Sequence, residues 1–195
     1  MRKIYSFFLG LLFLLTTTLS LHAQNSFFSD ISERAVATGG AKRVIVPNKF
    51  RTVNLNESAL KSFLWALPNG KAPNFNRNNA AVISLPKPDG TIARFQVWES
   101  SIQEPALQAR FSQIRTFAGQ GVDDPYATIR LDLTPRGFHA QVLSINGTYY
   151  IDPYAVGLTD SYISYFRQDL HKSSDWTCIA RGSRVAPALT ASEPR

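Results

Sequence analysis

Residues 128–154, TIRLDLTPRGFHAQVLSINGTYYIDPY, decide the fold. At the start of this stretch isoleucine and leucine alternate with arginine and aspartate, which is the period of a half-buried β-strand. TPRG at residues 134–137 has the composition of a turn, and NG at residues 146–147 is typical of a type I′ hairpin turn. We therefore expect a three-stranded antiparallel meander over residues 127–152.

Upstream of the meander, the sequence indicates a helix that begins after Asn56, whose side chain is suited to an N-cap. Apolar residues then follow at helical spacing, and they are Leu60, Phe63, Leu64 and Leu67. Such a stripe predicts one face packed on a core. The Pro-Asn-Gly sequence at residues 68–70 ends the helix.

A second hairpin is expected over residues 81–100, around the turn sequence PKPDG at residues 86–90. In this turn Gly90 is free to take a positive φ. Phe95 and Val97 fall on one face of the second arm, so we expect that face to meet the core.

Five other segments give weaker signals. An early strand is expected at residues 43–47 (RVIVP), a short extended piece at 50–55, a helix of about two turns within 104–114 and a loop at 115–127. Residues 160–170 are amphipathic at either period, which leaves their secondary structure open. The whole pattern predicts a strand-dominated α+β domain of antiparallel hairpins, sandwich-like, with one or two short helices.

The N-terminus has the layout of a secretory signal peptide. Two basic residues precede a long uncharged apolar run, and Ala23 lies at the expected cleavage point. We expect residues 1–23 to be removed, 24–49 to form an N-terminal segment and 50–178 to form one domain. Residues 179–195, rich in Ala, Ser, Pro and Arg, are typical of a linker.

The charges argue against a nucleic-acid partner. Loss of residues 1–23 removes Arg2 and Lys3 and lowers the net charge from +7 to +5. The remaining charges are scattered, as on a solvated surface. A second long apolar run is absent from the sequence, so we expect no stable membrane anchor and a secreted or cell-envelope location.

The sequence carries no familiar catalytic motif. HExxH, GxSxG, a phosphate-binding loop and a dinucleotide fingerprint are all missing, so we expect no enzyme activity from this chain and no cofactor of its own. Asp123-Asp124-Pro125 has the composition of a turn rather than of a calcium loop.

Cys178 is the single cysteine, so an intramolecular disulfide is excluded. Four roles stay open from the residues alone: an inert buried thiol, an intermolecular disulfide, a metal ligand or a catalytic nucleophile. A nucleophile would need a base, for which the candidates are His139 and His171.

Several motifs occur together in a fixed order. They are LPKPDG (85–90), FxVxES (95–100), FxxIxTFxG (111–119) and GFHAxVxxxxGxYYIDP (137–153). In order and spacing, the chain from about Phe50 to about Cys178 resembles the N-terminal pro-domain of secreted bacterial reprolysin-like (adamalysin-type) zinc metallopeptidases. The catalytic domain of that family, with its HExxH motif, is missing from this sequence.

The resemblance implies a module that assists the folding of a zinc metalloprotease domain, in cis or in trans, and keeps it inactive. It also implies that Cys178 is a ligand of the zinc in that partner, with release by cleavage in the linker beside Arg181 or Arg184. The chain would then be a truncated, separate or decayed part of such a protease. The alternative is a free-standing secreted β-rich binding or surface module without a protease partner.

Overall fold

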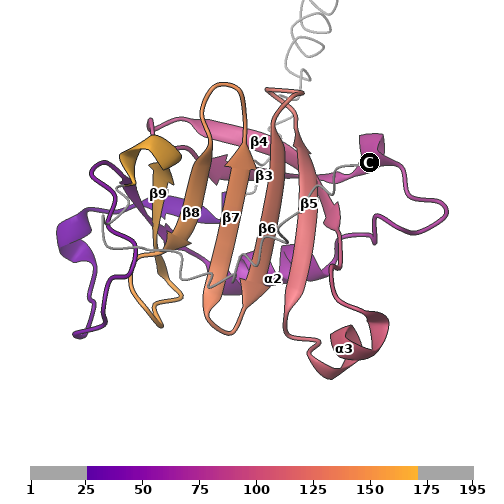
Figure 1. The fold of residues 1–195 in the computed structure, drawn as a ribbon, viewed down its shortest axis with the longest axis horizontal. Helices are drawn as coiled ribbons and strands as arrows, with labels where there is room; N and C mark the ends of the chain where they lie inside the picture. Colours follow the sequence, from indigo (N-terminus) through magenta and orange to yellow (C-terminus); the bar gives the residue numbers. More distant parts are fainter. Residues whose placement is uncertain (1–25, 171–195) are drawn as a thin grey trace, which may run out of the picture.

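The computed structural model describes residues 26–170. In this part of the chain all strand pairs are antiparallel, and nine strands form one sheet in the order β1-β2-β9-β8-β7-β6-β5-β4-β3 (Figure 1). The strands are β1 (Phe28–Asp30), β2 (Arg51–Leu55), β3 (Ala81–Pro86), β4 (Ile92–Glu99), β5 (Arg115–Gly121), β6 (Thr128–Thr134), β7 (Gly137–Leu143), β8 (Tyr149–Pro153) and β9 (Ser161–Phe166). The helices are α2 (Glu57–Trp65) and α3 (Pro105–Arg110), with short 3-10 turns η1 (Glu33–Ala35), η2 (Arg77–Asn79) and η3 (Arg167–Asp169).

The predicted meander is confirmed as β6, β7 and β8, and it extends further in both directions. From β3 to β9 each strand pairs with the next one in sequence. The loop between β7 and β8 differs from the expected type I′ turn, which needs two residues of positive φ. Only Gly147 has one there (φ 120°), and the amide of Asn146 instead donates a hydrogen bond to Ser144 Oγ at 3.0 Å.

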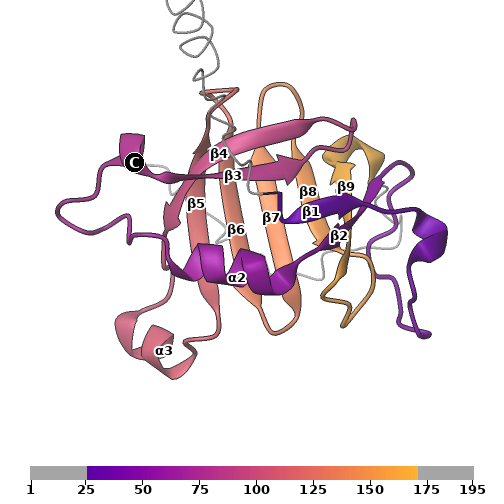
Figure 2. The same ribbon diagram turned by 180° about the vertical axis from the view of Figure 1, so that it is seen from behind.

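The sheet curls until its two ends approach each other. In Figure 2, seen from behind, β3 and β4 pass across the sheet at one end, while β1 and β2 turn in front of it at the other. Apolar side chains fill the space between, and the largest fully buried ones include Tyr162, Phe95, Phe117 and Phe138. The expected strand-dominated α+β fold is therefore confirmed, with its layers made by one nearly closed sheet.

Helix α2 closes the open side of this core, as the sequence predicts. The side chain of Asn56 accepts a hydrogen bond from the amide of Ala59 at 3.1 Å, which makes it the N-cap. Leu60 and Leu64 are fully buried, and Phe63 packs against Phe27 with ring centroids 5.1 Å apart. The apolar stripe thus faces the inside of the curled sheet.

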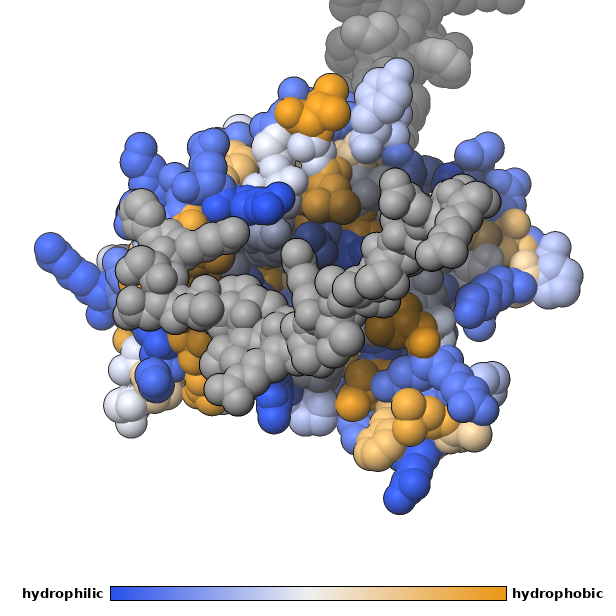
Figure 3. Space-filling model, in the orientation of Figure 1, coloured by the Kyte–Doolittle hydropathy of each residue, from blue (hydrophilic) through white to orange (hydrophobic). Residues whose placement is uncertain are grey.

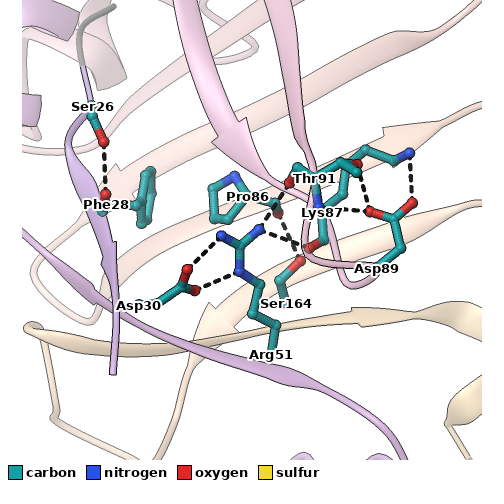
Figure 4. A network of polar contacts seen from close by, with 9 residues as sticks. All are labelled: Ser26, Phe28, Asp30, Arg51, Pro86, Lys87, Asp89, Thr91 and Ser164. Carbon is teal, nitrogen blue, oxygen red and sulfur yellow. Dashed lines mark hydrogen bonds and ion pairs between the residues drawn. The ribbon is translucent and has the colours of Figure 1, made fainter. Parts of the chain in front are cut away.

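Arg51 joins the two ends of the sheet (Figure 4). From β2 its guanidinium donates to both carboxylate oxygens of Asp30 in β1, at 2.6 and 2.9 Å. It also donates to the carbonyls of Lys87 and Thr91 in the β3–β4 turn, at 3.2 and 2.8 Å. Beside it, Ser164 of β9 donates to the carbonyl of Pro86 at 2.8 Å. Side chains therefore hold the seam between the ends of the sheet.

The segment 115–127 is not all loop as expected, because residues 115–121 form strand β5 in the middle of the sheet. Glycine weakens strands in general, so the two glycines of this segment favoured the expectation of a loop. At Gly119, a Cβ would lie 2.6 Å from the carbonyl of Gln96 and 2.7 Å from a methyl group of Ile129. Glycine is needed there because the neighbouring strands approach closely.

Three other segments also differ from the sequence patterns. Residues 43–47 form no strand, and Val44 and Val46 are exposed. Within the N-terminal segment, residues 28–30 instead form β1, which pairs with β2. The stretch 160–170, which the sequence left open, contains β9, whose first five residues are buried on both faces, so no simple alternation marks it as a strand.

The hairpin 81–100 and the helix at 105–110 are confirmed. Phe95 and Val97 are buried, and Gly90 has φ 91° in the turn. Helix α3 buries none of its residues. Within residues 26–170, neither helix has the length and apolar character needed to cross a membrane.

The contacts of Arg51 between the two ends of the sheet lead to a prediction about stability. We expect Arg51→Met to lower the free energy of unfolding by about 2 kcal/mol, because two carbonyls and a carboxylate lose their charged donor. Arg94→Met is the matched control, since Arg94 also forms a bidentate pair with an aspartate, Asp123, but on an exposed surface. Urea unfolding measures both, and equal losses in the two variants would contradict a special role for the seam.

Candidate functional site: a polar groove on the outer face of the sheet

The outer face of the meander carries a cluster of ionisable side chains. Because side chains alternate along a strand, the polar partners of the buried residues in β6, β7 and β8 all point away from the core. Asp132 lies opposite His139 in the β6–β7 register. Asp152 lies on the next strand, one position beyond the paired residues Ala140 and Ile151.

Asp152 is the centre of this cluster. One carboxylate oxygen of Asp152 lies 2.7 Å from His139 Nδ1. The other accepts a hydrogen bond of 2.7 Å from the Tyr165 hydroxyl. The Tyr165 ring also packs on Tyr150, with ring centroids 5.5 Å apart. Both oxygens of Asp152 are thus engaged, which fixes the orientation of the imidazole.

The surroundings shift the ionisation of the cluster. The hydrogen bond to Asp152 raises the pKa of His139 more than burial lowers it, and the charges of Asp152 and Asp132 add to the rise. Burial raises the pKa of the Asp132 carboxyl, with a smaller opposing effect from His139. Burial, together with the bond to Asp152, raises the pKa of Tyr165. His139 is therefore favoured as a cation beside Asp152.

This cluster forms the floor of a groove of about 1050 Å³. Lys71, Arg130 and Glu104 bring further charges to its walls. Residues 100–105, which lead into α3, form one rim. Within that rim the amide oxygen of Gln103 is buried and has no hydrogen-bond partner in the part of the chain described.

Apolar side chains stand beside the groove, on and before α3. Ile102 is 79% exposed and lines the groove, while Leu107 and Phe111 are 45% and 37% exposed. Figure 3 shows orange, apolar surface gathered over α3. An exposed apolar group beside a polar floor is typical of a surface that binds another protein.

Among residues 26–170, His139 contacts Asp152 as its hydrogen-bond partner and no hydroxyl or thiol nucleophile. Across the same residues, no group of three His, Cys, Asp or Glu side chains is arranged to hold a metal ion. The expected turn at Asp123-Asp124 is confirmed, since the amide of Tyr126 donates to the Asp124 side chain at 3.1 Å. Asp132 lies apart from it, in the groove.

The residues predicted for metal binding and processing lie outside the described residues. They are Cys178 as zinc ligand, Ala23 at the signal cleavage point, and Arg181 and Arg184 beside the expected processing site. His171 also lies outside them, whereas His139 is placed as expected for a half-exposed strand residue, with 38% of its side chain exposed. The pairing of His139 with Asp152 was not expected from the sequence, although both fall on the outward face of the predicted meander.

Comparisons with known proteins found no match: no family model fits the chain, and no curated protein or solved structure resembles it significantly. Residues 26–170 form a β-rich domain built on one nearly closed antiparallel sheet.

The His139–Asp152 pair predicts a pH dependence of stability. The raised pKa of His139 means that its stabilising effect is complete below the unfolded value of about 6.5 and is lost as pH rises through the folded pKa. We expect His139→Gln to lose about 1 kcal/mol at pH 6, an amount reduced by its partial exposure. Unfolding in urea between pH 5 and 9 measures this, and the profile of the variant should be flatter.

The control uses the partner carboxylate. Asp152→Asn should flatten the same profile, while Asp160→Asn, at an exposed position, should not. If His139→Gln and wild type had parallel profiles, the pair would not contribute to the pH dependence.

Proposed function

We propose that this chain is a secreted, non-enzymatic pro-domain-like module that binds and inhibits the catalytic domain of a reprolysin-type zinc metalloprotease. In this proposal the module assists the folding of that domain, and the Cys178 thiolate occupies the open position of its zinc. A catalytic zinc keeps one site for water, and a thiolate fills it at about 2.3 Å. The nucleophilic water is then displaced.

One observation carries the proposal. The motif at residues 137–153, one of the four that carry the resemblance, forms β7 and β8, and its outward residues form the floor of the groove. These residues are His139, Gln141, Tyr150 and Asp152. One part of the resemblance thus lies where the surface has a groove.

The position of Cys178 in sequence fits a partner held at this domain. Cys178 lies eight positions after Leu170, the last described residue. An extended chain of that length spans at most about 28 Å. The groove and the thiolate would therefore act on one protein of ordinary domain size.

Inhibition kinetics test the zinc-ligand role. The mature chain, residues 24–195, is added to a zinc peptidase domain with an HExxH motif that is encoded in frame or in an adjacent gene. We expect Cys178→Ala to raise the inhibition constant roughly 100-fold, because the zinc regains its water. Equal potency of wild type and variant would reject Cys178 as a ligand, and no inhibition by either would reject the inhibitor function.

The same assay tests the groove as the docking surface. Ile102→Asp places a charge on the apolar rim and should weaken inhibition about tenfold or more. Ile145→Asp is the matched control, because Ile145 is similarly exposed (84% against 79%) but lies in the β7–β8 loop, away from the groove. Equal effects of the two substitutions would place the docking surface elsewhere.

A further inference from the structure

An apolar hollow lies on the surface where three segments of the chain meet. They are the N-terminal segment around Val44, the β6–β7 turn and the loop that follows β8, and they enclose about 610 Å³. Val44 is 71% exposed and Val156 is 62% exposed. The apolar part of the lining consists of Val44, Ile45, Pro135, Pro153, Ala155 and Val156.

Contacts of the N-terminal segment keep this surface in place. The amide of Val156 donates a hydrogen bond of 3.0 Å to the carbonyl of Lys42, which joins the segment to the loop after β8. Next to it, the Arg43 guanidinium lies 4.2 Å from the centroid of the Tyr154 ring. Residues 43–47 pair with no strand of the described chain, and both of their valines are exposed. A concave apolar surface of this kind is typical of a docking site.

The end of the described chain lies beside the same segment. The amide of Asn48 donates to the carbonyl of Asp169 at 2.9 Å. Trp176 is the first large apolar residue after Leu170 and lies six positions beyond it, a length of chain that spans at most about 20 Å. Ile45 is three positions from Asn48, which is at most about 11 Å. The Trp176 indole can therefore reach the hollow.

Charge complementarity favours the same occupant. Arg136 lines the hollow and is exposed, and its guanidinium has no ion-pair partner within residues 26–170. Asp175 directly precedes Trp176 in the sequence. An indole placed in the hollow brings this carboxylate to the side of the hollow where an unpaired guanidinium is available, and such pairs form charge-assisted hydrogen bonds.

We propose that Trp176 of this chain inserts into the hollow, with Asp175 facing Arg136. Tryptophan is suited to such a contact because it buries a large apolar area at a low cost in side-chain entropy. Cys178, two positions further on, is then held close to the outer groove, since His139 lines both the hollow and the groove. The contact lies within one chain and does not require a protease partner.

Methyl NMR of the mature chain, residues 24–195, tests this contact. We expect the methyl resonances of Val44 and Val156 to carry upfield shifts from the indole ring, and Trp176→Ala should abolish these shifts. The Ile145 methyl groups are the control and should not move, because this residue is 84% exposed but does not line the hollow. The shifts should be the same at all protein concentrations, because the contact is intramolecular.

A second pair of variants tests the hollow itself. Val156→Asp should expose the Trp176 indole N–H to a soluble paramagnetic agent, whereas Ile145→Asp should leave it protected. The proposal is overturned if Trp176→Ala leaves the valine resonances unchanged, or if the two aspartate variants have the same effect. Shifts that grow with protein concentration would assign the hollow to a second copy of the chain, and shifts that appear only with an added peptidase domain would assign it to that partner. Either result also overturns the proposal.

Discussion

The guanidinium of Arg51 lies where the two ends of a nine-stranded sheet meet, and the rest of the structure depends on that closure. Strands at the ends of a sheet expose unpaired backbone groups and invite aggregation. Here two hydrogen bonds from Arg51 to turn carbonyls join the ends, and a bidentate ion pair with Asp30 on the adjacent strand holds the guanidinium in place. The closed sheet then encloses a core that a flat one would expose to water.

Closure also separates two kinds of surface. Along β8, Tyr149 and Ile151 point inward, whereas Tyr150 and Asp152 point outward. The inward pair therefore belongs to the core, and the outward pair belongs to the groove. The backbone of the strand lies between the two sets, so the polar residues of the groove are kept apart from the apolar core.

Much of the fold could be predicted from period and turn chemistry. The β6–β8 meander, the hairpin around Gly90 and the capped helix α2 have local signals, and all three are present. Strand β5 was missed because Gly119 is required by its neighbours on adjacent strands, which local propensity does not reveal. For the groove, alternation places His139 and Asp152 on one face. Their pairing depends on the register between β7 and β8, which the sequence pattern does not determine.

In the proposed inhibitor, the groove and the Cys178 thiol are two separate contacts on one chain, and their connection affects how tightly each is held. A cysteine of ordinary pKa is mostly protonated at neutral pH, so a free peptide with one thiol is a weak zinc ligand. Docking through the groove would hold Cys178, eight residues beyond Leu170, near the metal at an effective concentration in the millimolar range. Neither contact then needs to be strong alone. Processing at Arg181 or Arg184 would cut after Cys178, so the groove and the thiol would stay joined to each other while a protease domain attached in cis would be separated from both. Both contacts would then lose their high effective concentration, and the module could dissociate.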